Sequence, residues 1–180
     1  RCKVLSRLKM SIREKFTAYV HSLQDEICQA LEAVDGVAKF KSDKWQRDGG
    51  GGGDTRVIAN GGVFEKGGVN TSVVYGKLPE AMREKFGVTS DDFYATGISL
   101  VLHPVNPFVP TVHANFRYFE ILDGDNVVDQ WFGGGADLTP YYLFEEDPIH
   151  FHKTWKSVCD EHNSEFYPRF KKNCDEYFFN

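Results

Sequence analysis

The sequence predicts an α+β fold, built as a large antiparallel sheet flanked by helices. Apolar residues at helical spacing fill residues 5–34, extended segments separated by short turns occupy the middle, and helical patterns return from residue 147. Strands joined by short turns pair antiparallel, and helices that stand apart from such a run of strands are typical of the α+β class. Because 180 residues are the size of one ordinary domain, we expect residues 1–180 to form a single domain.

The first predicted element is one long amphipathic helix over residues 5–34. Its apolar residues step by three or four positions, which places them on one helical face. Asp35-Gly36 follows as the predicted C-cap. The basic start of the chain could indicate a mitochondrial presequence, but the apolar stripe continues for four more turns, so we interpret it as the first helix of the fold. The stripe consists of Leu5, Leu8, Ile12, Phe16, Tyr19, Leu23, Ile27, Leu31 and Val34.

Six strands and one short helix are predicted for the middle of the chain. Residues 65–68 are predicted as the turn of a hairpin between the second and third strands. Five glycines at 49–53 precede the second strand, and no Gly-Lys-Ser/Thr follows them, which excludes a Walker phosphate loop. Pro79 begins a short helix that ends at Phe86. The predicted strands are residues 37–45, 56–64, 69–75, 97–103, 111–122 and 126–132.

Two further helices are predicted at the end of the chain. Asp147-Pro148 has the residue types that favour a helix start, and this helix extends to about residue 162. The last segment, residues 165–180, is rich in aromatic residues and contains no Gly or Pro stop signal at its end. We therefore expect the chain to be the front portion of a longer domain, incomplete at the C-terminus.

Composition excludes several classes of partner and site. The chain has 21 Lys and Arg against 26 Asp and Glu, a net charge of −5, so a nucleic acid is not expected as a general partner. No apolar run approaches the ~20 residues that span a bilayer, so no membrane span is expected. The four cysteines form no C-x-x-C pair, which gives no support to a zinc knuckle or a thioredoxin-type site.

Polar side chains alternate with core residues along two of the predicted strands. In residues 111–119 and 97–103, every second side chain points to the same face of the sheet. If the two strands are neighbours, that face offers a hydroxyl, two imidazoles, an amide and a guanidinium. Such a surface suits an anionic ligand with N–H groups, although a solvated outer sheet face is the alternative interpretation. The residues are Ser99, His103, His113, Asn115 and Arg117.

A glycine-rich segment after the last predicted strand holds a second candidate group. Gly133-Gly134-Gly135-Ala136-Asp137 is predicted as a loop in which the glycines allow close backbone approach to a ligand. The Asp137 carboxylate could accept hydrogen bonds from ligand N–H groups or act as a base, or it could simply occupy a tight turn. His150 and His152 point apart on a helix and cannot chelate as a pair, but one of them could complete an open metal site with His103 and His113.

Five stretches of the sequence resemble the oxygen-dependent coproporphyrinogen III oxidase family. The matches run from about Trp45 to the last residue, most of the chain, and several are long. They depart from the family at Gln130 and Asn173, where its members usually have Trp. The stretches are VFEKGGVN at 63–70, HPVNPFVPTVHANFRYF at 103–119, WFGGGADLTPY at 131–141, EEDPIHFH at 145–152 and YPRFKK at 167–172.

The resemblance implies an enzyme of haem biosynthesis. Members oxidatively decarboxylate two propionates of coproporphyrinogen III to vinyl groups, giving protoporphyrinogen IX, with dioxygen as co-substrate and no redox cofactor. It also implies a broad antiparallel sheet flanked by helices and a homodimer, with residues 49–57 near the subunit contact. Relatives occur in the cytosol and in mitochondria, and since we find no convincing presequence, we expect a cytoplasmic protein, with mitochondrial as the alternative.

Individual roles carry over from the matching motifs. The resemblance implies that His113 donates a proton and that Asp137 hydrogen-bonds the pyrrole N–H groups. Ser99 and the stretch Asn115, Phe116 and Arg117 would contact the substrate, and Arg56 or Lys66 could help Arg117 bind the propionates. His103, His113 and His152 would belong to the histidine set that binds a divalent metal cation in bacterial-type relatives.

Two other functions stay open at this point. A non-catalytic tetrapyrrole-binding or dimer-forming fragment would keep the fold but lack the C-terminal catalytic elements. A histidine-ligated metal hydrolase would lose activity with a chelator and would not depend on oxygen.

Overall fold

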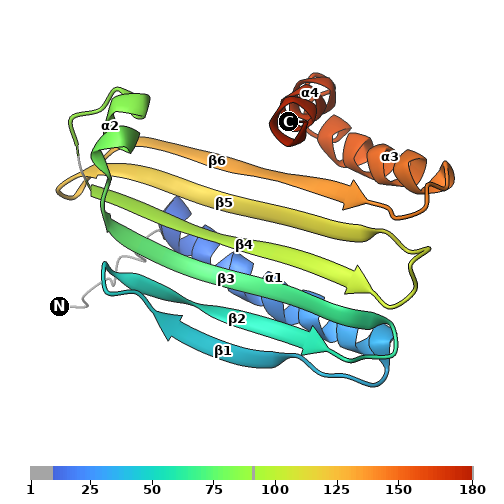
Figure 1. Ribbon diagram of the computed structural model, residues 1–180. Coiled ribbons are helices and arrows are strands. Elements are labelled where there is room, and N and C mark those ends of the chain that lie inside the picture. Colours follow the sequence, from blue (N-terminus) through green and yellow to red (C-terminus); the bar gives the residue numbers. More distant parts are fainter. Residues whose placement is uncertain (1–9, 91, 180) are drawn as a thin grey trace, which may run out of the picture.

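The α+β prediction is confirmed by a six-stranded antiparallel sheet with helices on both of its faces (Figure 1). The computed structural model describes residues 10–90 and 92–179. The strand order is β1-β2-β3-β4-β5-β6, so every strand pairs with its neighbours in sequence. The elements are α1 (Ile12–Asp35), β1 (Lys41–Gln46), β2 (Gly51–Ala59), β3 (Phe64–Lys77), α2 (Glu80–Phe86), β4 (Asp92–Pro104), β5 (Thr111–Asp123), β6 (Asn126–Thr139), α3 (Glu146–Asp160) and α4 (Phe166–Phe178).

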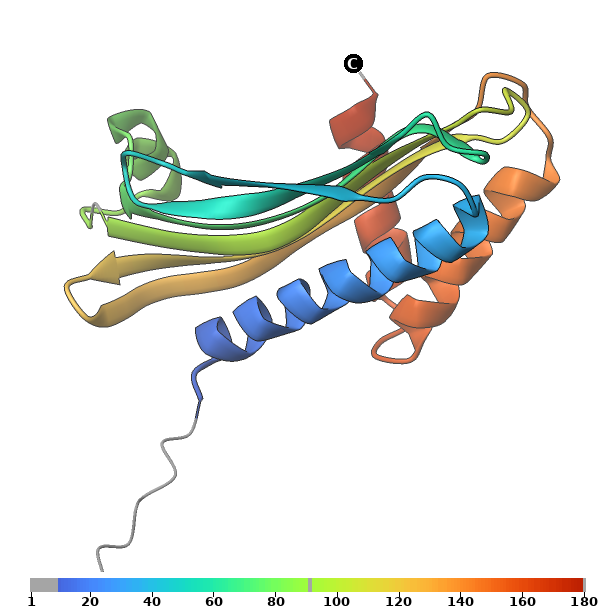
Figure 2. The ribbon, with the colours of Figure 1, turned by 90° about the horizontal axis from the view of Figure 1, so that it is seen from below.

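Helix α1 covers one face of the sheet, which we call the helix face (Figure 2). It begins with a capping box between Ser11 and Glu14 and ends at Gly36, whose φ of 70° is the left-handed conformation expected of a C-cap. The predicted Leu5 and Leu8 lie outside the described residues. The core beneath α1 is formed by the buried Val20, Cys28, Val69 and Ile98, with Phe16, Leu23, Ile27, Leu31, Phe40 and Leu100 packed against it.

The predicted position of the β2–β3 turn was wrong. Residues 65–68 belong to β3 and pair with β2, as in the pair between Ile58 and Gly67, while the chain reverses at residues 60–63. The Asp35 carboxylate explains this position, because it accepts N–H groups from Gly62, Val63 and Phe64 at 3.0–3.1 Å. The position of the turn is thus determined by a side chain at the end of α1, and the residues 60–68 themselves do not indicate it.

The loop predicted for residues 133–137 was wrong, because the whole segment lies inside β6, paired with β5. The second strand also begins earlier than predicted, since Gly51–Gly53 lie inside β2. Glycine is needed here for close packing between strands: a Cβ on Gly134 would lie 2.4 Å from the carbonyl oxygen of Asn115. The glycines therefore mark tight backbone contacts within strands, and Asp137 projects from a strand.

The short helix predicted over residues 79–86 is confirmed as α2, and it packs on the opposite face from α1 (Figure 2). Its Phe86 contacts Phe119 and Trp131 at one end of the sheet. The two C-terminal helices are confirmed as α3 and α4, and Trp155 of α3 contacts Phe116 of β5. Among the described residues, no helix combines the length and the apolar character needed to cross a membrane.

Gln130 has a structural role at the helix face that the sequence comparison did not suggest. Its side-chain oxygen lies 2.5 Å from the hydroxyl of the buried Tyr118, which also donates to Glu120 at 2.6 Å. Arg13 of α1 forms an ion pair with the same Glu120. Burial and the Glu120 carboxylate together raise the pKa of the Tyr118 phenol well above its usual value. A polar residue at position 130 therefore joins a network that connects α1 to β5 and β6.

Candidate active site

The register of the strands brings the predicted polar residues onto one face of the sheet, the face opposite α1, which we call the polar face. Ser99 pairs with Asn115, and Gly97 pairs with Arg117. His113 pairs with Val101 on one side and with Asp137 on the other. Directly opposed residues in an antiparallel sheet point to the same side, so the prediction of a shared face is confirmed. Because His103 lies four positions after Ser99, it joins the same face.

His113 and Asp137 form a hydrogen-bonded pair across β5 and β6. The His113 Nδ1 and Asp137 Oδ2 atoms are 2.7 Å apart, and each side chain retains about a third of its exposure (33% and 28%). The other oxygen of Asp137 accepts a longer bond from the Thr139 hydroxyl, at 3.4 Å. Such a bond orients the imidazole and leaves Nε2 as the ring nitrogen that can exchange a proton with a ligand.

Arg117 and Asn115 supply a cation and an amide beside this pair. The Arg117 guanidinium donates from Nη2 to the Asn115 side-chain oxygen at 3.1 Å, which holds both groups on the polar face. Arg117 is exposed. A planar guanidinium can bind a carboxylate with two parallel hydrogen bonds, so this arrangement suits a ligand that carries carboxylates.

In the central part of the polar face, glycines leave the backbone without covering side chains. Gly97, Gly133 and Gly135 oppose or neighbour Arg117 and Asn115 on this side of the sheet. A Cβ on Gly97 would lie 2.5 Å from the Phe116 carbonyl oxygen, so the fold requires that glycine. At Gly133 a Cβ would meet only the Arg117 side chain, at 3.8 Å, so the fold leaves room there, whereas at Gly135 it would lie 3.5 Å from the Sγ atom of Cys174, so α4 borders this part of the face. A broad, flat ligand can approach the backbone closely over this floor.

Aromatic side chains bound the polar face at one end. Phe119 stacks on Trp131 with ring centroids 4.7 Å apart and on Phe93 at 5.6 Å, and Phe86 of α2 lies 5.2 Å from Trp131. Towards β1, the Trp45 indole lies next to Gly53 and donates to the Thr55 hydroxyl at 3.2 Å. The contact of Phe86 with this end of the face was not predictable from local sequence, because it depends on α2 folding over the sheet.

Two predicted residues, Phe116 and His152, lie away from the polar face. Phe116 points to the helix face, 5.9 Å from Trp155 of α3. His152 belongs to the same helix α3 and contacts Tyr167 of α4. Within residues 10–90 and 92–179 no group of three or more His, Cys, Asp or Glu side chains is arranged to hold a metal ion, so His103, His113 and His152 are not brought together there. The divalent metal cation that the resemblance implies stays a prediction, and we assign no step to it.

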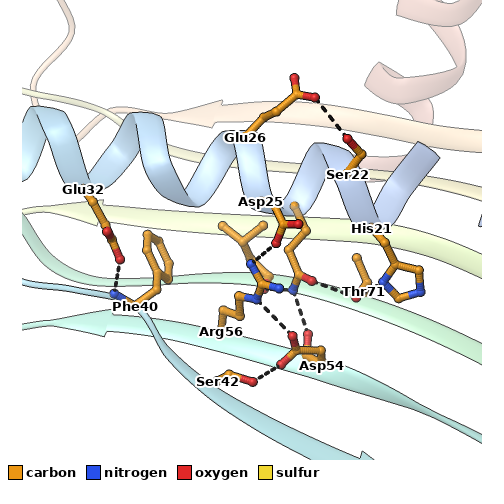
Figure 3. A network of polar contacts seen from close by, with 12 residues as sticks. His21, Ser22, Asp25, Glu26, Glu32, Phe40, Ser42, Asp54, Arg56 and Thr71 are labelled. Atoms are coloured by element: carbon orange, nitrogen blue, oxygen red, sulfur yellow. Dashed lines mark hydrogen bonds and ion pairs between the residues drawn. The ribbon is translucent and has the colours of Figure 1, made fainter. Parts of the chain in front are cut away.

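Arg56 also lies on the helix face, in a network of ion pairs below α1 (Figure 3). Its guanidinium contacts Asp25 at 2.6 Å and Asp54 at 2.9 Å, and the Ser42 hydroxyl donates to Asp54 at 2.5 Å. It therefore cannot assist Arg117 on the other side of the sheet. Two hollows of about 320 and 390 Å³ lie beside this network, and Arg56 and Asp54 line both of them, whereas no candidate residue of the polar face lines either.

Comparisons with known proteins agree with the resemblance seen in the motifs. The sequence pattern of the family described as coproporphyrinogen III oxidase matches residues 15–180. Coproporphyrinogen-III oxidase 1, chloroplastic, of Arabidopsis thaliana is 52% identical over 94% of this chain and 47% of its own length. The oxygen-dependent coproporphyrinogen-III oxidase of Drosophila melanogaster is 49% identical over 98% of the chain and 47% of its own length.

The mitochondrial oxygen-dependent enzyme of Rattus norvegicus is 48% identical over 97% of the chain and 42% of its own length. The chain thus spans slightly less than half the length of these relatives. The match over nearly all of its residues is nevertheless decisive for the family: this chain belongs to the coproporphyrinogen III oxidase family.

Proposed function

We propose that the protein containing this chain is an oxygen-dependent coproporphyrinogen III oxidase of haem biosynthesis. It converts two propionates of coproporphyrinogen III to vinyl groups and so gives protoporphyrinogen IX. One observation carries the proposal on the structural side: the His113–Asp137 pair lies on the same sheet face as Arg117 and Asn115, over a floor of glycines. This face combines a proton-transfer group, a carboxylate-binding cation and space for a flat macrocycle.

The proposed reaction balances without a bound redox group. For each propionate, R–CH2–CH2–COOH and O2 give R–CH=CH2, CO2 and H2O2. The bond between the carboxyl carbon and its neighbour breaks, a hydrogen leaves the carbon attached to the ring, and two electrons pass to dioxygen. A reduced tetrapyrrole is electron-rich, so removing a pyrrole proton would raise its electron density enough to react with dioxygen directly.

The residues of the polar face have distinct roles in this proposal. Arg117 binds a propionate, with Lys66 as a second cation, because Lys66 pairs directly with His103 on the polar face. Ser99 and Asn115 add a hydroxyl and an amide. His113 exchanges a proton through Nε2 while Asp137 holds Nδ1, and Asp137 also faces the pyrrole N–H groups. Phe116 supports this surface from the opposite face.

The homodimer and the compartment are also part of the proposal. Residues 49–57, implied to lie near the subunit contact, form the turn after β1 and most of β2, at the β1 edge of the sheet. The names of the Arabidopsis and rat proteins place them in chloroplasts and mitochondria. These names support the mitochondrial alternative more than the cytoplasmic expectation.

The test compares turnover of coproporphyrinogen III in air and under nitrogen. We measure it for this chain and for a version extended to the full length of its relatives. The proposal expects oxygen-dependent release of CO2 with one H2O2 for each CO2. It fails if the extended protein is equally active without oxygen. Activity that disappears with a chelator and continues under nitrogen would instead favour a metal hydrolase. Binding without turnover by this chain, with turnover restored in the extended version, would favour a non-catalytic fragment.

A further inference from the structure

Asn70 of β3 is a polar residue of the same face that the motifs left without a role. It pairs directly with Ser99, Ser99 pairs with Asn115, and Asn115 pairs with Gly135. These residues form one row across β3, β4, β5 and β6, on the side of the sheet away from α1. Asn70 therefore extends the proposed substrate surface by one strand.

The Asn70 amide lacks the partner that fixes Asn115. The Asn115 oxygen accepts a hydrogen bond from Arg117, whereas the Asn70 oxygen is shielded from solvent and has no hydrogen-bond partner among the described residues. Because no hydrogen bond holds the shielded oxygen and a carboxylate cannot donate to it, the N–H group is the part of the Asn70 amide that can bind a carboxylate ligand. Gly68 gives the amide room, since a Cβ there would lie 3.6 and 3.7 Å from its nitrogen and oxygen.

The position of Asn70 relative to Asp137 decides which part of the substrate it meets. Three strand spacings and an offset of two residues separate them, which corresponds to about 16 Å between their backbones. In a tetrapyrrole the N–H groups converge on the centre and the propionates extend from the rim. If Asp137 faces the centre, Asn70 lies at the rim.

We propose that Asn70 is a substrate-binding residue, whose amide N–H group donates to a propionate carboxylate of the tetrapyrrole. The neighbouring Ser99 hydroxyl donates to the second oxygen of the same carboxylate, because side chains at directly paired positions lie about 5 Å apart at Cβ. This inference rests on the proposed function. Asn70 would supply an uncharged hydrogen-bond donor on β3, two strands away from the Arg117 guanidinium on β5.

Binding of coproporphyrin III, the stable oxidised form that keeps all four propionates, tests this role in the full-length protein. Asn70→Ala is expected to weaken binding about 10-fold, as for the loss of a hydrogen bond to a charged group. Asn70→Asp is expected to weaken it further, because two carboxylates then face each other, and added salt reduces that excess. Asn70→Ser keeps a donor and is expected to stay within about 3-fold of the unsubstituted protein.

Asn126→Ala and Asn126→Asp are the matched controls, because Asn126 is exposed in the β5–β6 hairpin, beyond this row. Circular dichroism identifies any variant that has not folded, and if Asn70→Ala has not folded, Asn70→Asp, which is equal in size to asparagine, carries the test. The inference is overturned if Asn70→Ala and Asn70→Asp bind coproporphyrin III like the Asn126 variants, or if Asp binds as tightly as Asn. A failure of the proposed function looks different: the unsubstituted protein then neither turns over coproporphyrinogen nor binds coproporphyrin III.

Discussion

Gln24 provides the most direct test of how α1 is held against the sheet that carries the site. The side chain is fully buried and spans two strands: its amide nitrogen donates to the carbonyl oxygens of Asp54 at 2.8 Å and Val69 at 2.9 Å. Its oxygen accepts from the Thr71 hydroxyl at 3.0 Å. Gln24→Leu keeps the size of the side chain and removes all three hydrogen bonds.

The expected cost follows from those three bonds. A neutral hydrogen bond contributes about 0.5–1.5 kcal/mol net, and the groups left behind on β2 and β3 stay buried without a partner, so the free energy of unfolding should fall by about 2–4 kcal/mol. For a chain of this size that lowers Tm by roughly 4–16 °C. Thermal unfolding followed by circular dichroism measures the change.

Gln29→Leu is the control, because Gln29 lies on the same helix and is exposed. Surface substitutions of this kind usually change stability by less than about 0.5 kcal/mol. Equal Tm values for Gln24→Leu and Gln29→Leu would refute the conclusion that buried hydrogen bonds to β2 and β3 hold α1 in place.

Three further predictions concern the site, the β2–β3 turn and the helix-face network. Asp137→Asn removes the charge that faces His113, and we expect at least a 10-fold lower kcat for coproporphyrinogen; unchanged turnover would contradict the assigned role. Backbone N–H groups, chiefly those of Ala38 and Phe64, hold the pKa of Asp35 far below its usual value. The ionised Asp35 carboxylate therefore stabilises the folded protein above about pH 4, and this contribution is lost as the pH falls towards the folded-state pKa. The midpoint of urea unfolding should consequently fall less on acidification in Asp35→Asn than in the unsubstituted protein. Tyr118→Phe should lower stability by about 1–2 kcal/mol, measured by urea unfolding, and an unchanged midpoint would exclude a role for the hydroxyl contacts to Glu120.

The number of strands and the faces of β4 and β5 were predictable because they depend on local pattern. Alternation in β4 and β5 assigned Ser99 and Asn115 to one face, and their direct pairing confirms it. The β2–β3 turn was not predictable, because Asp35 determines it from another element. Local sequence holds no information about a bond formed from 28 residues away.

Part of the site was predictable, because the face to which a strand residue points follows from local spacing. His113 and Arg117 share a strand, so their common face follows from their spacing of four. Asp137 was expected near a ligand but in a loop, because its glycine neighbours resemble turn residues when the partner strand is unknown. Asn70 was missed because its relation to Ser99 appears only in the register of β3 with β4.

The central claim is that the polar face, with its glycine floor, binds the tetrapyrrole. Gly133→Leu tests it most directly, because a Cβ at this position meets only the Arg117 side chain at 3.8 Å, so the fold accommodates it while the added side chain occupies the floor. Fluorescence titration with coproporphyrin III should show saturable binding to the unsubstituted protein and to Glu26→Leu, an equally apolar change on an exposed part of α1. Loss of binding in Gly133→Leu alone is the predicted result, and equal affinity in all three proteins would contradict the claim.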